Sequence, residues 1–193
     1  MAMILASQSP RRRELLGQMG FSFTVRPAKG EELPHPELTP AQLVEELARQ
    51  KALEVSAEAE ADDVVVAADT VVAIDGKVLG KPHDKVHAAQ MLSALSGREH
   101  TVYTGVAVKR GETLLVEHEA TQVRFRPLTE REIDLYIQTG EPMDKAGSYG
   151  IQGCGALLVE GIRGDYFNVM GLPVLRLGRM LQSFGLDLFT LGR

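Results

Sequence analysis

The 193-residue sequence has little that could form covalent or metal crosslinks: one cysteine, Cys154, with no tryptophan and only 5% aromatic residues. A single cysteine excludes an internal disulfide framework and a cysteine-rich metal site, so we expect a reducing, cytoplasmic compartment. No apolar run approaches the roughly 18 residues of a membrane-spanning helix. The N-terminus places its short apolar run before its arginines, the reverse of a secretory signal. We therefore expect a cytoplasmic protein without a membrane segment.

The chain also has no excess of positive charge, since it has 21 Lys and Arg residues and 26 Asp and Glu residues, for a formal net charge of -5. Binding to a nucleic-acid polymer uses many Lys and Arg side chains along a groove, which this composition argues against. The densest basic cluster is Arg11, Arg12 and Arg13. Three positive charges suit a small polyanion, so we expect a small-molecule partner and no nucleic-acid polymer.

Strand-like and helix-like segments alternate along the chain without an internal repeat, which predicts an α/β or mixed α+β fold in a single domain over residues 1–193. Asp75-Gly76 predicts a hairpin turn, and Thr129 with Glu132 fits a capping box. The pattern predicts strands over 3–6, 21–26, 64–74, 77–80, 100–109, 113–125 and 156–159. It predicts helices over 10–19, 40–59, 83–95, 129–137 and 172–184.

A strand passes into a helix at residues 7–13, SQSPRRR, with Ser9 as the expected N-cap and Pro10 at the first helical position. Unbonded N–H groups make a helix start electropositive, so each cation in the first turn costs roughly 0.3–1 kcal/mol. An anion bound there would remove the conflict, and phosphate is the usual one. A solvated basic surface is the alternative interpretation.

Asp69 and Thr70 interrupt the apolar strand VVVAADTVVAI at residues 64–74. A carboxylate among valines is costly to desolvate unless it is paired, protonated or bound to a metal. In a triphosphate site, Asp69 would hold a divalent cation or take a proton from an attacking water. The alternative is a structural ion pair with Lys51 or Lys81, and each of these lysines is otherwise an ordinary surface residue.

Two further pairs of residues resemble metal ligands more weakly. Glu31 and Glu32 lie in a loop with prolines and offer a second carboxylate to the same cation, although such acids are usually solvated. His83 and His87 are four residues apart on a predicted helix, but no third ligand is evident, so we expect them in solvent. P-loop and serine-hydrolase motifs do not occur.

Several segments, in this order, resemble the Maf family of nucleotide pyrophosphatases: LASQSPRRRELL, AADTVV, GKPHD, TVYTGVAV, FRPLTEREIDLYI, DKAGSYGIQG and GDYFNVMGLP. They cover most of the chain from Ile4 to Leu181. The YGIQG form at residues 149–153, following DKAG, resembles the branch that acts on dTTP and UTP, whereas a sister branch prefers 7-methyl-GTP. The resemblance implies an elongated α/β fold similar to the inosine triphosphate pyrophosphatases, with two lobes around a cleft and often a homodimer.

The resemblance also implies residue roles. Asp69 would be the proton acceptor that activates water, assisted by a divalent cation (Mg, Mn or Co) that Asp69 and Glu32 hold. The phosphates would be bound by Ser7, Arg12, Lys51 and Lys81. The pyrimidine preference would be set by Arg11, Thr70 and Gln152. Gly30-Glu31 before Glu32 departs from the family pattern, because many members have an aspartate there.

Together these features predict a nucleoside triphosphate pyrophosphatase that hydrolyses dTTP, UTP or a modified pyrimidine triphosphate to the monophosphate and pyrophosphate. Two alternatives remain open. One is a 7-methyl-GTP pyrophosphatase with the same chemistry, and the other is a non-catalytic, nucleotide-responsive regulator of septum formation.

Overall fold

The computed structural model describes residues 1–30, 35–186 and 189. Its strands are β1 (Met3–Leu5), β2 (Thr24–Val25), β3 (Val64–Ile74), β4 (Lys77–Leu79), β5 (Glu99–Arg110), β6 (Thr113–Phe125) and β7 (Val159–Arg163). Its α-helices are α1 (Pro10–Gln18), α2 (Pro40–Ser56), α3 (Lys85–Leu95), α4 (Glu130–Gln138), α5 (Tyr166–Met170) and α6 (Val174–Ser183). Short 3-10 helices are η1 (Glu141–Asp144), η2 (Ala146–Ser148) and η3 (Gly153–Leu158).

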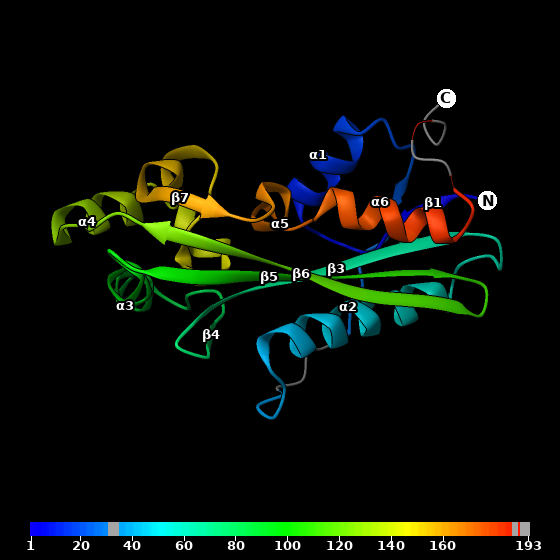
Figure 1. The fold of residues 1–193 in the computed structure, drawn as a ribbon, viewed down its shortest axis with the longest axis horizontal. Helices are drawn as coiled ribbons and strands as arrows, with labels where there is room; N and C mark the ends of the chain where they lie inside the picture. Colours follow the sequence, from blue (N-terminus) through cyan, green and yellow to red (C-terminus); the bar gives the residue numbers. More distant parts are fainter. Residues whose placement is uncertain (31–34, 187–188, 190–193) are drawn as a thin grey trace.

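One mixed sheet runs through the molecule in the order β2-β1-β3-β5-β6-β7, with β4 also paired to β3 (Figure 1). On one side of β3, the parallel strand β1 pairs with residues 64–66 and the antiparallel strand β4 pairs with residues 72–74. Between them, residues 67–71 have no strand partner on that side within the described residues. Asp69 and Thr70 therefore lie at a gap in the edge of the sheet.

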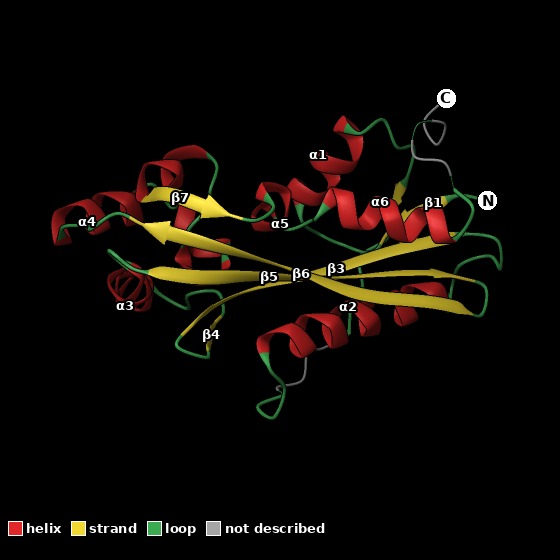
Figure 2. Cartoon of the chain, in the orientation of Figure 1, coloured by secondary structure: helices red, strands yellow, loops and turns green. Residues whose placement is uncertain are grey.

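Helices cover the two halves of this sheet differently, which gives the molecule two lobes (Figures 1 and 2). In one lobe α1 and α6 lie on one face of the sheet and α2 lies on the other, with a buried apolar cluster on each face. In the other lobe a third cluster joins the sheet to α3 and α4. The elongated, two-lobed α/β fold predicted from the sequence is confirmed.

Helix α2 packs directly against the backbone of β5 at Gly105. A β-carbon at this position would lie 2.1 Å from the carbonyl oxygen of Val44 in α2, so only glycine fits. The helix presents small side chains to the sheet there, and Ala48 and Ala52 are completely buried. Gly105 is the register partner of Asp69, so the close contact occurs beside the gap in the sheet edge.

Local signals in the sequence account for several element boundaries. The predicted hairpin is confirmed, because Asp75 and Gly76 have φ values of 51° and 73°, as a type I′ turn requires. Thr129 and Glu132 form the predicted capping box at α4. Helix α3 begins at Lys85, two residues later than predicted, because the Asp84 side chain accepts the first hydrogen bond as its N-cap.

Other predictions of local structure were wrong. The strand expected over 21–26 is reduced to Thr24–Val25, and the strand expected over 156–159 is replaced by η3, with β7 following. Helix α5 was not predicted. Ser9 occupies the N-cap position of α1 with an extended backbone, but its side chain makes no capping hydrogen bond.

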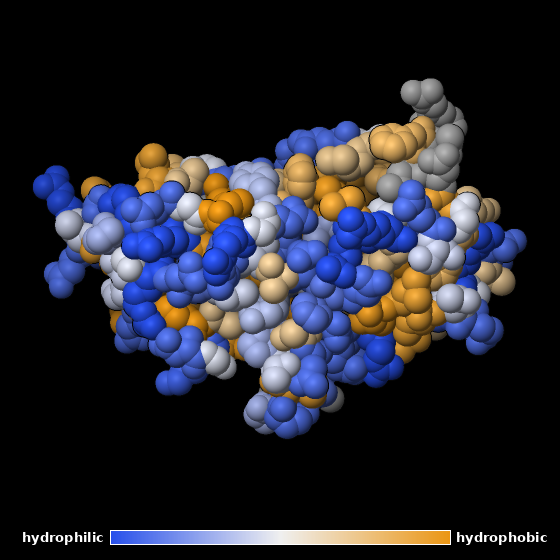
Figure 3. Space-filling model, viewed as in Figure 1, coloured by the Kyte–Doolittle hydropathy of each residue, from blue (hydrophilic) through white to orange (hydrophobic). Residues whose placement is uncertain are grey.

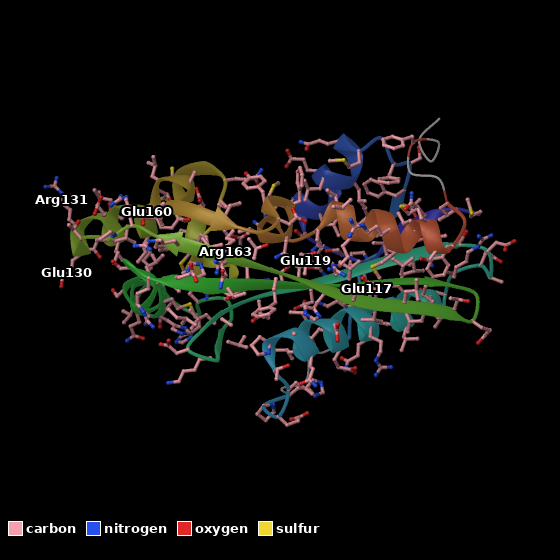
Figure 4. The ribbon with its side chains drawn as sticks, viewed as in Figure 1. Glu117, Glu119, Glu130, Arg131, Glu160 and Arg163 are labelled. Atoms are coloured by element: carbon pink, nitrogen blue, oxygen red, sulfur yellow. The ribbon has the colours of Figure 1, made fainter. Side chains whose placement is uncertain are left out.

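Charged side chains join elements at the surface, which is mostly hydrophilic with small apolar patches in the view of Figure 3. Arg176 of α6 donates to Glu117 of β6 at 2.5 Å and to Glu119 of β6 at 3.0 Å. The two glutamates are labelled on β6 in Figure 4. These bonds tie α6 to the half of β6 that β7 does not reach. Among the helices in the described ranges, none has the length and apolar character to span a membrane.

We expect Gly105→Ala to lower the free energy of unfolding by about 3 kcal/mol, because the added methyl group forces α2 away from β5. Guanidinium unfolding followed by circular dichroism measures the change. Gly161→Ala in β7 is the matched control, since no atom lies within 4 Å of a β-carbon built there. Equal stabilities of the two variants would contradict the close-packing argument.

Candidate functional site

A cavity of about 570 Å³ opens at the gap between β1 and β4. Its walls come from the β1–α1 turn, the middle of β3, α2 and the segments around residues 144–151 and 169–171. Among the described residues, two carboxylates line it, Asp69 and Asp144, together with six cationic side chains: Arg11, Arg12, Lys29, Lys51, Lys81 and Lys145. Within a chain of net charge -5, positive charge is thus concentrated at one opening, as an anion site requires.

Asp69 and Thr70 point to opposite faces of the sheet because side chains alternate along a strand. Asp69 faces α2, where Lys51 Nζ donates to its Oδ1 atom at 2.5 Å. The side chains of Asp69 and Lys51 are only 13% and 20% exposed. Thr70 faces α1, where Arg12 Nη2 donates to its hydroxyl at 2.9 Å. Of the two lysines predicted as partners of Asp69, Lys51 makes the ion pair, and the pair lies in the cavity wall.

Arg12 connects α1 to the unpaired edge of β3. Its Nη1 atom donates at 2.7 Å to the carbonyl oxygen of Ala68, which β1 does not reach, and at 3.2 Å to the hydroxyl of Ser7. Its Nε atom donates at 2.7 Å to the carbonyl oxygen of Gly171, after α5. Carbonyl and hydroxyl oxygens of the protein therefore accept hydrogen bonds from one of the three arginines at this helix start.

The hydroxyl of Thr70 belongs to a hydrogen-bond chain with a defined direction. Thr104 Oγ1 donates to the carbonyl oxygen of Asn168 at 3.0 Å, so it accepts from Thr70 Oγ1 at 2.9 Å. A hydroxyl has one hydrogen, and Thr70 uses it toward Thr104 while it accepts from Arg12. Thr70 can consequently contact a ligand only as an acceptor.

A smaller cavity of about 260 Å³ adjoins the first and is lined by Gln152. The two share Arg11, Lys145 and Tyr149 in their walls. Tyr149 is held from behind, because its hydroxyl lies 2.7 Å from Nε2 of the buried His100. Burial lowers the pKa of His100 to about 4 and raises the pKa of Tyr149, so both side chains are neutral near neutral pH.

The structure brings most of the sequence-predicted residues to these two cavities. The larger is lined by Ser7, Arg11, Arg12, Lys51, Asp69, Thr70 and Lys81, and the smaller by Arg11 and Gln152. Glu31 and Glu32 lie outside the described residues. His83 and His87 line neither cavity; they contact each other, with their Nδ1 atoms 2.5 Å apart.

Sequence reasoning missed Lys29, Asp144 and Lys145 as individual site residues. The DKAG segment was the only signal that pointed to the last two. Lys145 Nζ donates to Asp144 Oδ1 at 2.7 Å. Burial acts to raise the pKa of Asp144, but this hydrogen bond and the charges of Lys145 and Arg11 outweigh it and lower the pKa.

Asp69 is suited to hold a divalent cation. Within the described ranges, no three His, Cys, Asp or Glu side chains converge as a metal site. Only Oδ1 of the Asp69 carboxylate has a hydrogen bond among the described residues. Magnesium commonly takes one or two protein carboxylates and completes its shell with water and phosphate oxygens. The Asp69 carboxylate therefore fits a cation that is bound largely through phosphate oxygens and water.

Comparison with known proteins gives sequence matches over nearly the whole chain. The family model described as Maf-like protein matches residues 2–184. A dTTP/UTP pyrophosphatase of Symbiobacterium thermophilum is 53% identical over 191 residues, covering 98% of this chain and 97% of the relative. A dTTP/UTP pyrophosphatase of Moorella thermoacetica is 53% identical over 190 residues, covering 97% of each chain.

Solved structures with little sequence similarity share the fold. A HAM1 protein from Coxiella burnetii matches with a TM-score of 0.54 and 14% identity, covering 95% of this chain and 100% of that one. The Staphylococcus aureus Ham1 protein matches with a TM-score of 0.51 and 14% identity, covering 95% and 97%.

We expect Arg12→Lys to lower the free energy of unfolding by about 2 kcal/mol, because one ammonium group cannot serve both backbone carbonyls and both hydroxyls. Arg13→Lys is the matched control, since Arg13 is the exposed neighbour on the same helix. Denaturant unfolding of both variants tests this. An Arg12→Lys variant as stable as the control would show that the hydrogen bonds of Arg12 to Ala68 and Gly171 do not stabilise the fold.

Proposed function

The chain belongs to the Maf family, and we propose on that premise that it hydrolyses dTTP and UTP to the nucleoside monophosphate and pyrophosphate. The observation that carries the proposal is the set of six cationic side chains around Asp69 at the open sheet edge. A nucleoside triphosphate is a compact anion of matching charge. Modified pyrimidine triphosphates fall within the same proposal, as substrates of an enzyme that cleans the nucleotide pool.

The phosphate chain is bound by residues at the start of α1, on α2 and after β4. Ser7, Arg12, Lys51 and Lys81 bind phosphate oxygens, and Arg12 also holds Ser7 and Thr70 in position. The cationic groups stabilise the negative charge that develops on the departing pyrophosphate. Arg12 and Lys51 are already held by hydrogen bonds to β3, so their part of this stabilisation needs little rearrangement during the reaction.

Asp69 is the proton acceptor in this proposal. A water molecule attacks the α-phosphorus, the bond from that phosphorus to the bridging oxygen breaks, and the Asp69 carboxylate takes the proton of the water. The bond from Lys51 fixes Oδ1 and so orients the carboxylate in the cavity wall. Asp69 and Glu32 would hold a divalent cation, Mg²⁺, Mn²⁺ or Co²⁺, which when bound would neutralise phosphate oxygens and acidify water.

Arg11, Thr70 and Gln152 select the pyrimidine. The edge of uracil or thymine has one N–H donor between two carbonyl acceptors. Thr70 offers only an acceptor, whereas Arg11 offers donors and the Gln152 amide offers both kinds of group. The resemblance to the family and the single cysteine support the remaining parts of the proposal, a cytoplasmic enzyme that acts as a homodimer.

A panel of triphosphates with the purified protein tests the substrate. We expect pyrophosphate release from dTTP and UTP with kcat/KM at least about tenfold above that for GTP, because the base contacts match a pyrimidine edge. A preference for 7-methyl-GTP would refute the pyrimidine assignment. Nucleotides that bind without being cleaved would instead favour a regulatory protein.

We expect Asp69→Asn to lower kcat for dTTP by about 10²–10⁴-fold, because an amide cannot accept the proton of the attacking water. The fold should persist, which circular dichroism verifies. Asp134→Asn is the matched control, since Asp134 lies exposed on α4 and lines neither cavity. Near-normal pyrophosphate release by a folded Asp69→Asn variant would remove Asp69 from this role.

A further inference from the structure

The carboxylate of Glu141, in η1, is the centre of a set of hydrogen bonds beside the smaller cavity. Its Oε1 atom accepts from the Tyr136 hydroxyl at 2.8 Å and from the backbone N–H of Gly155 at 3.0 Å. Its Oε2 atom accepts from the backbone N–H of Cys154 at 3.0 Å. One side chain thus binds the end of the loop over residues 150–155.

Tyr136 of α4 extends this attachment to the start of the loop. Its hydroxyl donates to Glu141, so it accepts from the backbone N–H of Gly150, at 3.2 Å. Burial raises the pKa of Tyr136, which keeps the hydroxyl proton in place. Both ends of the 150–155 loop are therefore bound to the same Tyr136–Glu141 pair.

Two glycines of this segment, Gly153 and Gly155, lie close to the same carboxylate. Gly153 has a φ of 64°, and a β-carbon there would lie 2.7 Å from Oε2 of Glu141. A β-carbon at Gly155 would lie 2.0 Å from the carbonyl oxygen of Gly150 and 3.0 Å from Oε1 of Glu141. The backbone can close around the carboxylate only because these positions have no side chain.

This loop carries residues that face the ligand cavities. Ile151 and Gln152 line the smaller cavity, between the two bound ends of the loop. Lys145, which lines both cavities, donates through Nζ to the backbone carbonyl of Glu141 at 2.7 Å. Two walls of the smaller cavity thus depend on Glu141, one through its side chain and one through its backbone.

We propose that Glu141 is a positioning residue for nucleobase selection, which sets the place of Gln152 and Ile151 by fixing the loop over residues 150–155. The inference rests on the proposed function, since it assumes that the base lies where the two cavities adjoin, within reach of the 150–155 loop. Glu141 lies in the wall of the smaller cavity, but both of its carboxylate oxygens are already bound by the Tyr136 hydroxyl and the backbone of the loop. It acts through the loop, so its loss should affect the choice of base more than the chemical step.

Glu141→Gln tests this with little change of size. The amide replaces one acceptor oxygen with an NH₂ donor that faces a backbone N–H, so part of the attachment is lost. We expect the ratio of kcat/KM for dTTP to that for GTP to fall roughly tenfold, mainly through KM for dTTP, with kcat within about threefold of the wild type. Hydrogen exchange at the amides of Cys154 and Gly155 should become faster.

Glu160→Gln is the matched control, because Glu160 of β7 is an exposed glutamate that accepts from Arg124 at 2.7 Å and lines neither cavity (Figure 4). Gly153→Ala disturbs the same contact from the side of the loop, because the added methyl group would lie against Glu141 Oε2. It should also lower the ratio of kcat/KM for dTTP to that for GTP. In the double variant, the loss of selectivity, expressed as a free energy, should be smaller than the sum of the losses in the two single variants, since both changes disrupt one contact.

The outcomes separate this inference from the proposed function. A wild-type protein that cleaves none of the triphosphates overturns the function. A selective wild type whose Glu141→Gln variant is folded and equally selective overturns the positioning role alone, as does an equal loss of kcat for every triphosphate. Unchanged exchange at Cys154 and Gly155 would show that the carboxylate does not hold the loop.

Discussion

The contact of α2 with the backbone of β5 at Gly105 is the constraint on which the geometry of the site depends. Gly105 pairs with Asp69, so the helix comes closest to the sheet beside that carboxylate. At this distance Lys51 reaches Asp69 and both side chains are largely withdrawn from water. The Asp69–Lys51 ion pair, between β3 and α2, therefore depends on a glycine at position 105 of β5.

Sequence patterns singled out residues that line the larger cavity where a local signal existed. The interruption at Asp69 and Thr70 stands out because the surrounding strand is apolar, and the period of two places the two side chains on opposite faces. The gap between β1 and β4 could not be predicted in this way. It arises from the pairing of segments about sixty residues apart, which leaves no mark on the strand itself.

Tertiary hydrogen bonds explain what the sequence could not distinguish. Arg11, Arg12 and Arg13 look equivalent as a triplet, yet Arg12 binds a carbonyl 159 residues away while Arg13 is exposed. The strand predicted over 156–159 failed for a similar reason. Its first three residues belong to η3, which begins at Gly153 and whose first turn is hydrogen-bonded to Glu141, a contact distant from the local apolar pattern.

The charge of the cavity also affects how a ligand arrives. The described part of the cavity lining holds six cationic side chains and two carboxylates, whereas the whole chain carries a formal net charge of -5. A diffusing anion is repelled over most of the surface and attracted at one opening. Encounters are thereby steered to the cavity, and their rate depends on the ionic strength of the medium.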